Sequence, residues 1–268
     1  MRAKWIVGGI VGTLGAAFFG LFAVLIHKRM PSPYWSIQYY AAPDGDDRND
    51  CLSPQAPCRS GRAAIRKMPP GIHNLQLAPG KYAEVLDVNH GRQVTIWGPF
   101  KGDACVDPAL VAVDGIDVQD NATIWVGCLT AKHIGCRQWS IADIEYVIIG
   151  EDGKQAVSAN ETCRINFVRT IWVDANIAAL AVATNYSTIH VGARIELRTP
   201  ATAPNYLFRA EDATIDLRNA TFLGHSLASG LRYSLDNGIL FLPRGGVDAI
   251  PGNGGESVNR SICRPACN

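Results

Sequence analysis

Short runs of β-branched and aliphatic residues recur along the chain after Gly71, and apolar and polar residues alternate within them. Such alternation is typical of a β-strand that buries one face. The runs occupy residues 94–97, 122–126, 143–148, 164–167, 187–191 and 213–217. Aligning one isoleucine from each run gives steps of 28, 20, 21, 24 and 26 residues between Ile96, Ile124, Ile144, Ile165, Ile189 and Ile215. This spacing predicts a β-solenoid, because a coil of that size buries its apolar face only when neighbouring coils stack on it.

One short helix is expected before these strands. It covers Ser60–Met68, with Ser60 as the N-cap and Pro69–Pro70 as the stop. The predicted fold is therefore all-β, a parallel β-helix with a short N-terminal capping helix, preceded by one transmembrane helix. An antiparallel β-sandwich is the alternative, because turn signals also recur at the spacing of about 8 to 12 residues that is typical of a sandwich.

The isoleucine alignment also predicts which side chains face solvent. With the isoleucines inward, the next residue of each strand points outward. The predicted outward column is Trp125, Glu145, Asn166, His190 and Asp216. Coils lie about 4.8 Å apart, so His190 and Asp216 are expected to touch, as a general base and its orienting carboxylate do. A solvated sheet face with polar ladders explains the same column, and a sugar-binding strip with Trp125 as its apolar platform is the second interpretation.

Three arginines come shortly after residues of this column in the sequence. Arg194, Glu196 and Arg198 alternate with apolar residues, and Arg218 follows Asp216 by two positions. A β-elimination lyase uses such an arginine as a base beside calcium-binding carboxylates, but no carboxylate cluster accompanies these arginines in the sequence. The candidate catalytic residues are His190, Asp216, Arg194, Arg198 and Arg218.

A calcium site is the one metal site that the sequence indicates, and no other cofactor is expected. Oxygen-bearing side chains alternate around Gly45, with Asp44, Asp46 and Asp50 as the candidate ligands. The twelfth-position glutamate of an EF-hand is missing, because Gln55 stands there. A polar turn leading into a disulfide explains the same residues.

The N-terminal segment Trp5–Ile26 has 22 residues without a charge. That length suffices for a transmembrane helix, whereas a signal-peptide core has only about 7 to 15 residues. Because no small-x-small cleavage site follows, we expect residues 1–29 to form an uncleaved signal anchor, with a juxtamembrane linker over 30–42; cleavage is the alternative. One face of the anchor carries small residues that favour self-association: Gly8, Gly12, Ala16 and Gly20.

Eight cysteines follow the anchor. An even number with several close pairs suits an oxidising compartment, so the domain after the anchor is expected on the periplasmic or extracellular side of the membrane. The predicted local disulfides are Cys51–Cys58 and Cys263–Cys267. Either bridges or buried thiols suit the remaining four, Cys105, Cys128, Cys136 and Cys163. The β-helix domain is expected over residues 43–268, with a loop-rich C-terminal cap over about 225–268.

The start of this domain resembles the opening of right-handed parallel β-helix proteins of the pectate-lyase-like superfamily. The matching features are a Gly/Asp/Asn-rich turn over residues 44–50, a proline, the Ser60–Met68 helix and the turn Pro79-Gly80-Lys81-Tyr82. The order matches across residues 39–98. The resemblance implies a right-handed coil, and it leaves the reaction open, because this architecture serves lyases, hydrolases, esterases, phage tail proteins and non-catalytic surface proteins. No catalytic motif of the lyases, polygalacturonases or pectin esterases is present.

Charge narrows the possible partners. The formal net charge is +1 and the charged fraction is 18%, so the chain has no basic field for nucleic acid. The leading hypothesis is a membrane-anchored protein of the cell envelope that binds a glycan or another surface partner without catalysis. The alternatives are a polysaccharide lyase or glycoside hydrolase acting on the lateral face, and a structural module of the phage-tail type.

Overall fold

The computed structural model describes residues 36–151, 154–174, 177–198, 201–224, 228–258 and 261–264. The chain divides into two compact units, Met1–Ser36 and Ile37–Asn268, and the second is the subject below. Within the described ranges no helix is both long and apolar enough to cross a membrane. The anchor expected over residues 5–26, with Gly8, Gly12, Ala16 and Gly20, lies outside those ranges.

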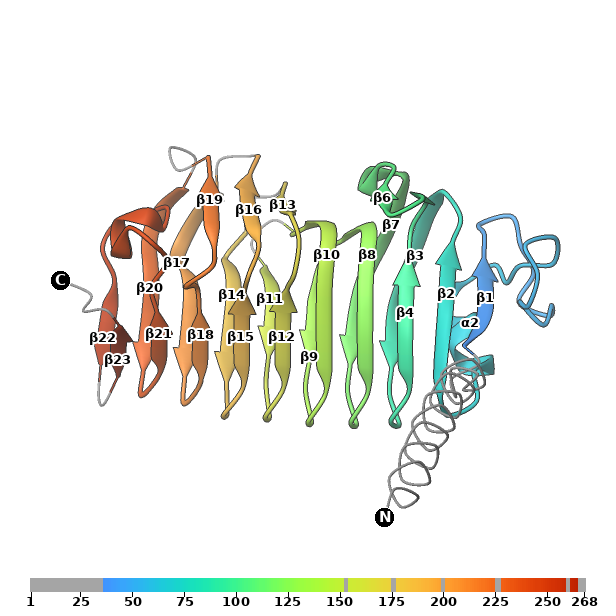
Figure 1. The fold of residues 1–268 in the computed structure, drawn as a ribbon, viewed down its shortest axis with the longest axis horizontal. Helices are drawn as coiled ribbons and strands as arrows, with labels where there is room; N and C mark the ends of the chain where they lie inside the picture. The colour runs from blue at the N-terminus through green and yellow to red at the C-terminus, as the bar shows by residue number, and fades with distance from the viewer. Residues whose placement is uncertain are drawn as a thin grey trace, which may run out of the picture. The chain divides into compact units, whose positions relative to one another are not determined.

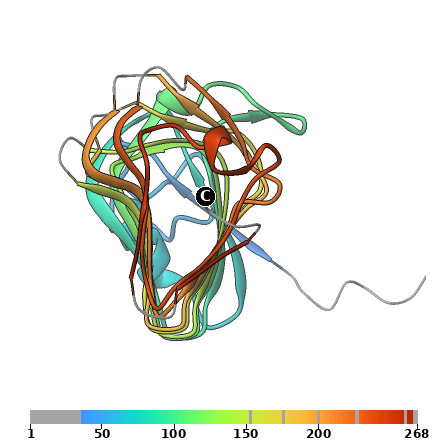
Figure 2. The same cartoon turned by 90° about the vertical axis from the view of Figure 1, so that its left-hand side faces the viewer.

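Three columns of parallel strands coil around one apolar interior (Figures 1 and 2). Face A runs through β1 (Ile37–Ala41), β2 (Ile72–Leu77), β4 (Gln93–Trp97), β8 (Thr123–Ala131), β10 (Ile141–Ile149), β12 (Arg164–Phe167), β15 (Thr188–Val191), β18 (Thr214–Asp216), β21 (Ile239–Phe241) and β23 (Ile262–Arg264). Because these strands all pair in parallel, the fold is a parallel β-helix and the antiparallel sandwich alternative is wrong.

The other two faces complete each coil. Face B is formed by the first halves of β3 (Gly80–Val88) and β7 (Val111–Val118), the second halves of β8 and β10, then β13 (Ile171–Val173), β16 (Arg194–Leu197) and β19 (Thr221–Leu223). Face C is formed by the second halves of β3 and β7, then β9 (Ile134–Cys136), β11 (Gln155–Ala159), β14 (Ala179–Thr184), β17 (Ala201–Glu211), β20 (Ala228–Asp236) and β22 (Glu256–Val258).

The core consists of inward side chains stacked coil on coil. Ile124, Ile165, Ile189 and Ile215 stand in one row, as predicted, and all four are fully buried. Ile96 and Ile144 are also buried, but they stand in the next inward row. Burying such a side chain contributes about 1.5–3 kcal/mol, and each coil repeats the contribution.

The corner between faces C and A turns through left-handed residues. Asp120 and Asn121 have φ of 57° and 59°, and the next corners repeat this at Gln138/Trp139, Glu161/Thr162 and Asn185/Tyr186. Two successive left-handed residues turn the chain sharply from one face to the next. Asparagine tolerates that conformation best among non-glycine residues. Asparagine side chains also join neighbouring corners, because Asn185 Nδ2 donates to Asn160 Oδ1 at 2.7 Å.

The start of the β-helix is built as the sequence indicates. Helix α2 (Gly61–Lys67) begins after Ser60, whose Oγ accepts a hydrogen bond from the Ala63 amide at 3.0 Å. In the Pro79–Tyr82 turn, a Cβ on Gly80 would come within 2.3 Å of Pro43, so only glycine lets that proline approach. The buried Tyr82 hydroxyl lies 3.0 Å from the Ala41 carbonyl, which ties β3 to the end of β1.

Strands occur in both segments that flank the central coils. Ile37–Ala41 lies in the segment expected as a linker, yet it forms β1 and pairs with β2. The segment expected as a loop-rich cap contains β20 to β23, together with a loop that holds the 3-10 helix η3 (Gly246–Ala249). Propensity alone hides both, because a strand is recognised here only by the coil on which it stacks.

Among the described residues of the β-helix, the structure shows three disulfides. Cys51–Cys58 is bridged as predicted. The pairs Cys105–Cys128 and Cys136–Cys163 are bridged as well, which decides between bridges and free thiols for these four residues. Cys267 lies outside the described ranges, so the Cys263–Cys267 bridge stays a prediction.

Candidate functional site

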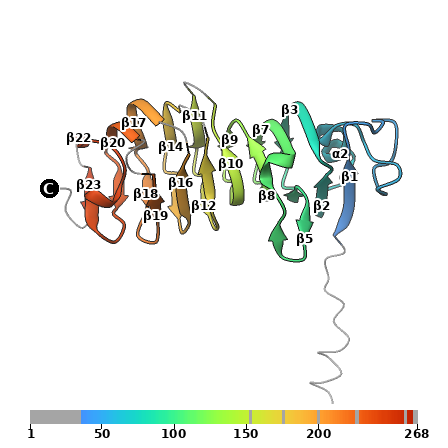
Figure 3. The ribbon, with the colours of Figure 1, turned by 90° about the horizontal axis from the view of Figure 1, so that it is seen from above.

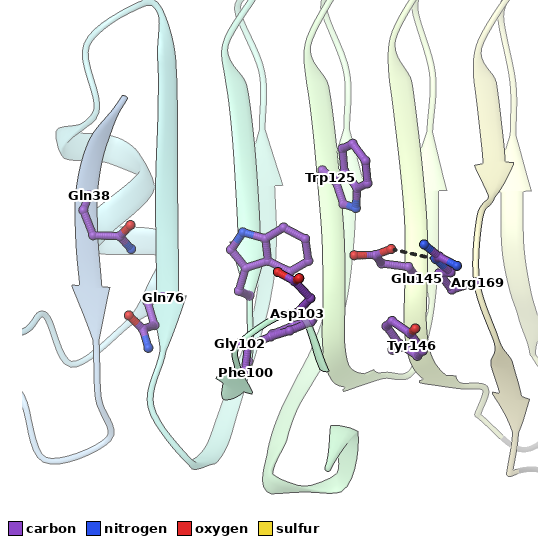
Figure 4. A pocket seen from close by; sticks show the side chains of 11 residues that line it. Gln38, Gln76, Phe100, Gly102, Asp103, Trp125, Glu145, Tyr146 and Arg169 are labelled. Atoms are coloured by element: carbon purple, nitrogen blue, oxygen red, sulfur yellow. Dashed lines mark ion pairs between the residues drawn. The ribbon is translucent and has the colours of Figure 1, made fainter. Parts of the chain in front are cut away.

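A cleft of about 510 Å³ lies on face A near the start of the β-helix (Figure 4). Its floor comes from successive strands and consists of Gln38 (β1), Gln76 (β2), Trp97 (β4), Trp125 (β8) and Glu145 (β10). Because neighbouring strands lie about 4.8 Å apart, the cleft follows the axis of the stack. An elongated ligand would lie across the strands rather than along them.

A hairpin forms one wall of the cleft. It consists of β5 (Phe100–Lys101) and β6 (Ala104–Cys105), which pair antiparallel, and it precedes the 3-10 helix η1 (Pro108–Leu110). The hairpin projects from the side of the stack in Figure 3. The Cys105–Cys128 disulfide fastens its end to β8. Phe100, Gly102 and Asp103 face the cleft from it.

Aromatic rings cover the central part of the cleft. The Trp97 and Trp125 ring centroids lie 6.3 Å apart with the planes tilted by 39°, and Phe100 meets Trp97 edge-on at 4.9 Å. A Cβ on Gly127 would come within 2.7 Å of the Trp97 ring. The absence of a side chain at Gly127 therefore lets the Trp97 indole lie across the neighbouring strand.

Glu145 is the buried charge of the cleft. Only 12% of its side chain is exposed, the Trp125 indole lies beside it (Figure 4), and Arg169 Nε lies 4.0 Å from its Oε2. Burial raises the pKa of the Glu145 carboxyl above its ordinary value, and the Trp125 indole N–H and the Arg169 charge only partly oppose that rise. The carboxyl is therefore easier to protonate than an exposed glutamate.

The outward column differs from the predicted one at a single position. Trp125 is followed in register by Asp143, Asn166, His190 and Asp216, whereas Glu145 lies two residues further along β10. The prediction for Glu145 was wrong because strands have a period of two, so that a shift of two residues leaves the same faces inward and outward. Asp143 takes the place in the ladder, and its Oδ1 accepts a hydrogen bond from Asn166 Nδ2 at 2.6 Å.

His190 and Asp216 touch, as the alignment predicted. His190 Nδ1 lies 3.2 Å from Asp216 Oδ2, and Arg218 Nη2 lies 2.6 Å from the same oxygen. Burial pushes the pKa of Asp216 up, but the hydrogen bonds from Arg218 outweigh it and hold the pKa below its ordinary value. Neither His190 nor Asp216 lines the cleft. A carboxylate shared between a histidine and an arginine on a sheet face has the geometry of a structural ladder.

The remaining candidate arginines belong to face B. Glu196 pairs with both, since Arg194 Nη2 and Arg198 Nε lie 3.7 and 3.8 Å from its carboxylate oxygens. The Arg198 guanidinium also stacks over the Trp172 ring at 4.8 Å. The structure thus joins Arg218 to Asp216 and places Arg194 and Arg198 with a different carboxylate.

In the candidate calcium loop, Asp46 and Asp50 interact with residues of the loop itself. Asp46 forms an ion pair with Arg48 at 2.6 Å, which lowers the pKa of Asp46 to about 2. Asp50 Oδ1 accepts from the Leu52 amide at 3.0 Å. Among the residues that the structure describes, no group of three or more His, Cys, Asp or Glu side chains gathers as metal ligands do.

The hairpin and the tryptophan beside it were missed in the sequence. The step of 28 residues from Ile96 to Ile124 exceeds the next step of 20, and the excess is the hairpin inserted after β4. Cys105 within the inserted segment was a second signal, because a disulfide fixes a projecting loop to the sheet. Trp97 follows the aligned Ile96 and so was an outward residue by the same rule that selected Trp125.

No similarity to a known protein assigns a role to the cleft. No protein-family model matches this chain, and no curated protein and no solved structure matches it either.

Proposed function

We propose that this protein is an exported, membrane-anchored β-helix that binds a glycan in the cleft of Trp97 and Trp125 without catalysing a reaction. The carrying observation is the tilted Trp97–Trp125 pair on the floor of an open cleft. Indole faces pack against the apolar faces of sugar rings, while the amides of Gln38 and Gln76 can bond hydroxyl groups. A cleft of this volume falls in the usual range for ligand sites.

Two features support export and membrane anchoring. Three disulfides within one domain suit an oxidising compartment outside the cytoplasm. The uncharged segment Trp5–Ile26 has the length of a bilayer span. We also infer a right-handed coil of the pectate-lyase-like kind, because parallel crossover connections are right-handed in about 98% of cases and the opening motif resembles that superfamily.

A glycan array with the full-length chain tests the proposal. The chain is kept in a polyoxyethylene detergent, since a detergent with a sugar headgroup would compete for the cleft. We expect binding that is lost in Trp125→Ala and in Trp97→Ala, and kept in His190→Ala, whose side chain lies outside the cleft. Binding that persists in both tryptophan variants, or no binding to any glycan, would contradict the proposal.

Glycoside hydrolysis is the second candidate, and one observation favours it. Asp103 and Glu145 place two carboxyl groups in the same cleft, and the pKa of Glu145 is raised, as a general acid requires. Reducing ends are measured after incubation of the wild type and of Glu145→Gln with each glycan that binds. Release of reducing ends by the wild type and its loss in Glu145→Gln would replace the binding role with an enzymatic one.

A further inference from the structure

The cleft has more carboxylates than positively charged side chains. Its lining has two carboxylates, Asp103 and Glu145, against one guanidinium, that of Arg169. Arg169 faces Glu145 at 4.0 Å, so these two charges oppose each other. Asp103 is exposed, and it forms no hydrogen bond or ion pair with any residue in the described part of the chain. One negative charge is therefore left to face a ligand.

The aromatic lining reinforces that preference. The faces of indole and benzene rings carry negative charge density, which attracts cations and is indifferent or unfavourable to carboxylates. Phe100 and Asp103 belong to the same hairpin, and Phe100 meets Trp97 at 4.9 Å. Asp103 and Phe100 therefore line the cleft from the same hairpin (Figure 4), and Trp97 lines it from β4.

Arg169, the positively charged residue of the cleft, lies at the opposite end from Trp97. Trp97 belongs to β4, whereas Arg169 follows β12, three coils further along the stack. At about 4.8 Å for each coil, that separation is roughly 14 Å. A positively charged group beside Trp97 and Asp103 therefore meets little repulsion from Arg169, whose own charge is opposed by Glu145.

We infer that the cleft selects glycans with free amino groups, that is, hexosamine units carrying a protonated amine, over N-acetylated and acidic glycans. This inference rests on the proposed glycan-binding function. The ammonium group lies between the Asp103 carboxylate and the Trp97 face, where it gains a charge pair and a cation–π contact together. The sugar ring packs on Trp125. An acidic polysaccharide, the substrate expected of a lyase, meets the unpaired Asp103 instead.

Calorimetry with the full-length chain compares three oligosaccharides of equal length, made of glucosamine, N-acetylglucosamine or galacturonic acid. We expect glucosamine to bind about tenfold more tightly than N-acetylglucosamine, a difference of ~1.4 kcal/mol, and galacturonic acid to bind most weakly. Roughly 0.5 M salt should reduce the glucosamine preference, because the Asp103 pair is exposed and therefore screened.

Asp103→Asn tests the residue that carries the selection. We expect it to bring the two affinities to within about threefold of each other, while Asp174→Asn, an exposed aspartate outside the cleft, leaves the tenfold preference unchanged. Thermal unfolding of both variants confirms that they fold.

The outcomes separate the two proposals. Equal affinity for glucosamine and N-acetylglucosamine, both lost in Trp125→Ala, would overturn the selection and keep glycan binding. Tighter binding of galacturonic acid would overturn the selection as well. No tryptophan-dependent binding of any of the three would remove both. Tetramethylammonium that binds as tightly as the glucosamine oligosaccharide would show that the cleft recognises the cation without the sugar, and would also overturn the selection of glycans.

Discussion

The indole of Trp125 lies beside the carboxyl group of Glu145 in the cleft (Figure 4), although the two residues stand in different outward rows of face A. Trp125 pairs in register with Asp143, so the contact with Glu145 runs diagonally between neighbouring strands. It holds a buried carboxyl group against a half-exposed ring at the centre of the cleft. The shape of the cleft and its charge therefore depend on the same pair of side chains.

Glu145 should make the stability of the protein depend on pH in a defined direction. Its pKa is raised in the folded state by burial, so folding favours the protonated form. The stability that Glu145 contributes is then fully present below the unfolded pKa of about 4.3 and is lost as the pH rises through the folded pKa. Urea unfolding should show that the free energy of unfolding of the wild type falls relative to that of Glu145→Gln as the pH rises above about 4. A difference that stays constant with pH would contradict this assignment.

Gly127 should be required for the Trp97 platform. A Cβ there would come within 2.7 Å of the Trp97 ring and 3.0 Å of the Glu145 carbonyl oxygen. Gly127→Ala should therefore displace the indole, lower the free energy of unfolding by about 1–2 kcal/mol and weaken glycan binding about tenfold. Gly192→Ala is the matched control, because its Cβ would meet nothing closer than 3.5 Å. Equal affinities of the two variants would show that the ring position is unimportant.

The Cys105–Cys128 disulfide should hold the hairpin wall in place. It closes a sequence separation of 23 residues, and replacing both cysteines by serine should cost about 2–4 kcal/mol of stability. The same double variant should bind glycan more weakly, because Phe100 and Asp103 lose their fixed positions. Replacing Cys51 and Cys58, whose bridge lies outside the cleft, should lower stability without changing affinity. The explanation fails if both double variants bind as the wild type does.

Asp216 should stabilise the fold without contributing to glycan affinity. Its pKa is lowered in the folded state, because the hydrogen bonds from Arg218 outweigh burial, so its contribution is present at neutral pH and is lost as the pH falls through the folded pKa. Asp216→Asn should be about 1–3 kcal/mol less stable at pH 7, with the difference shrinking below about pH 4. Chemical unfolding measures the stability, and unchanged affinity for glycan is the second expectation. If Asp216→Asn loses glycan affinity without losing stability, the ligand binds at His190 and Asp216 instead of in the cleft.

The sequence predicted the coil and part of the site for a physical reason. Inward isoleucines such as Ile165 and Ile189 repeat because every coil must bury the same row, and His190 and Asp216 follow from that alignment. The two-residue misplacement of Glu145 could not be seen, since inward Ala142 and Ile144 satisfy the same pattern. The long step from Ile96 to Ile124 signalled the inserted hairpin. The cleft itself could not be predicted, because the contact between Phe100 of the hairpin and Trp97 appears in no local pattern.

Hydroxyl-radical footprinting with a glucosamine oligosaccharide measures where the ligand binds. Trp125 lies in the cleft and is 41% exposed, whereas Trp139 lies on the corner between faces C and A and is 69% exposed. Oxidation of each tryptophan is measured by mass spectrometry with and without the sugar. We expect the sugar to slow oxidation of Trp125 and to leave oxidation of Trp139 unchanged. Protection of Trp139 with no change at Trp125 would contradict it.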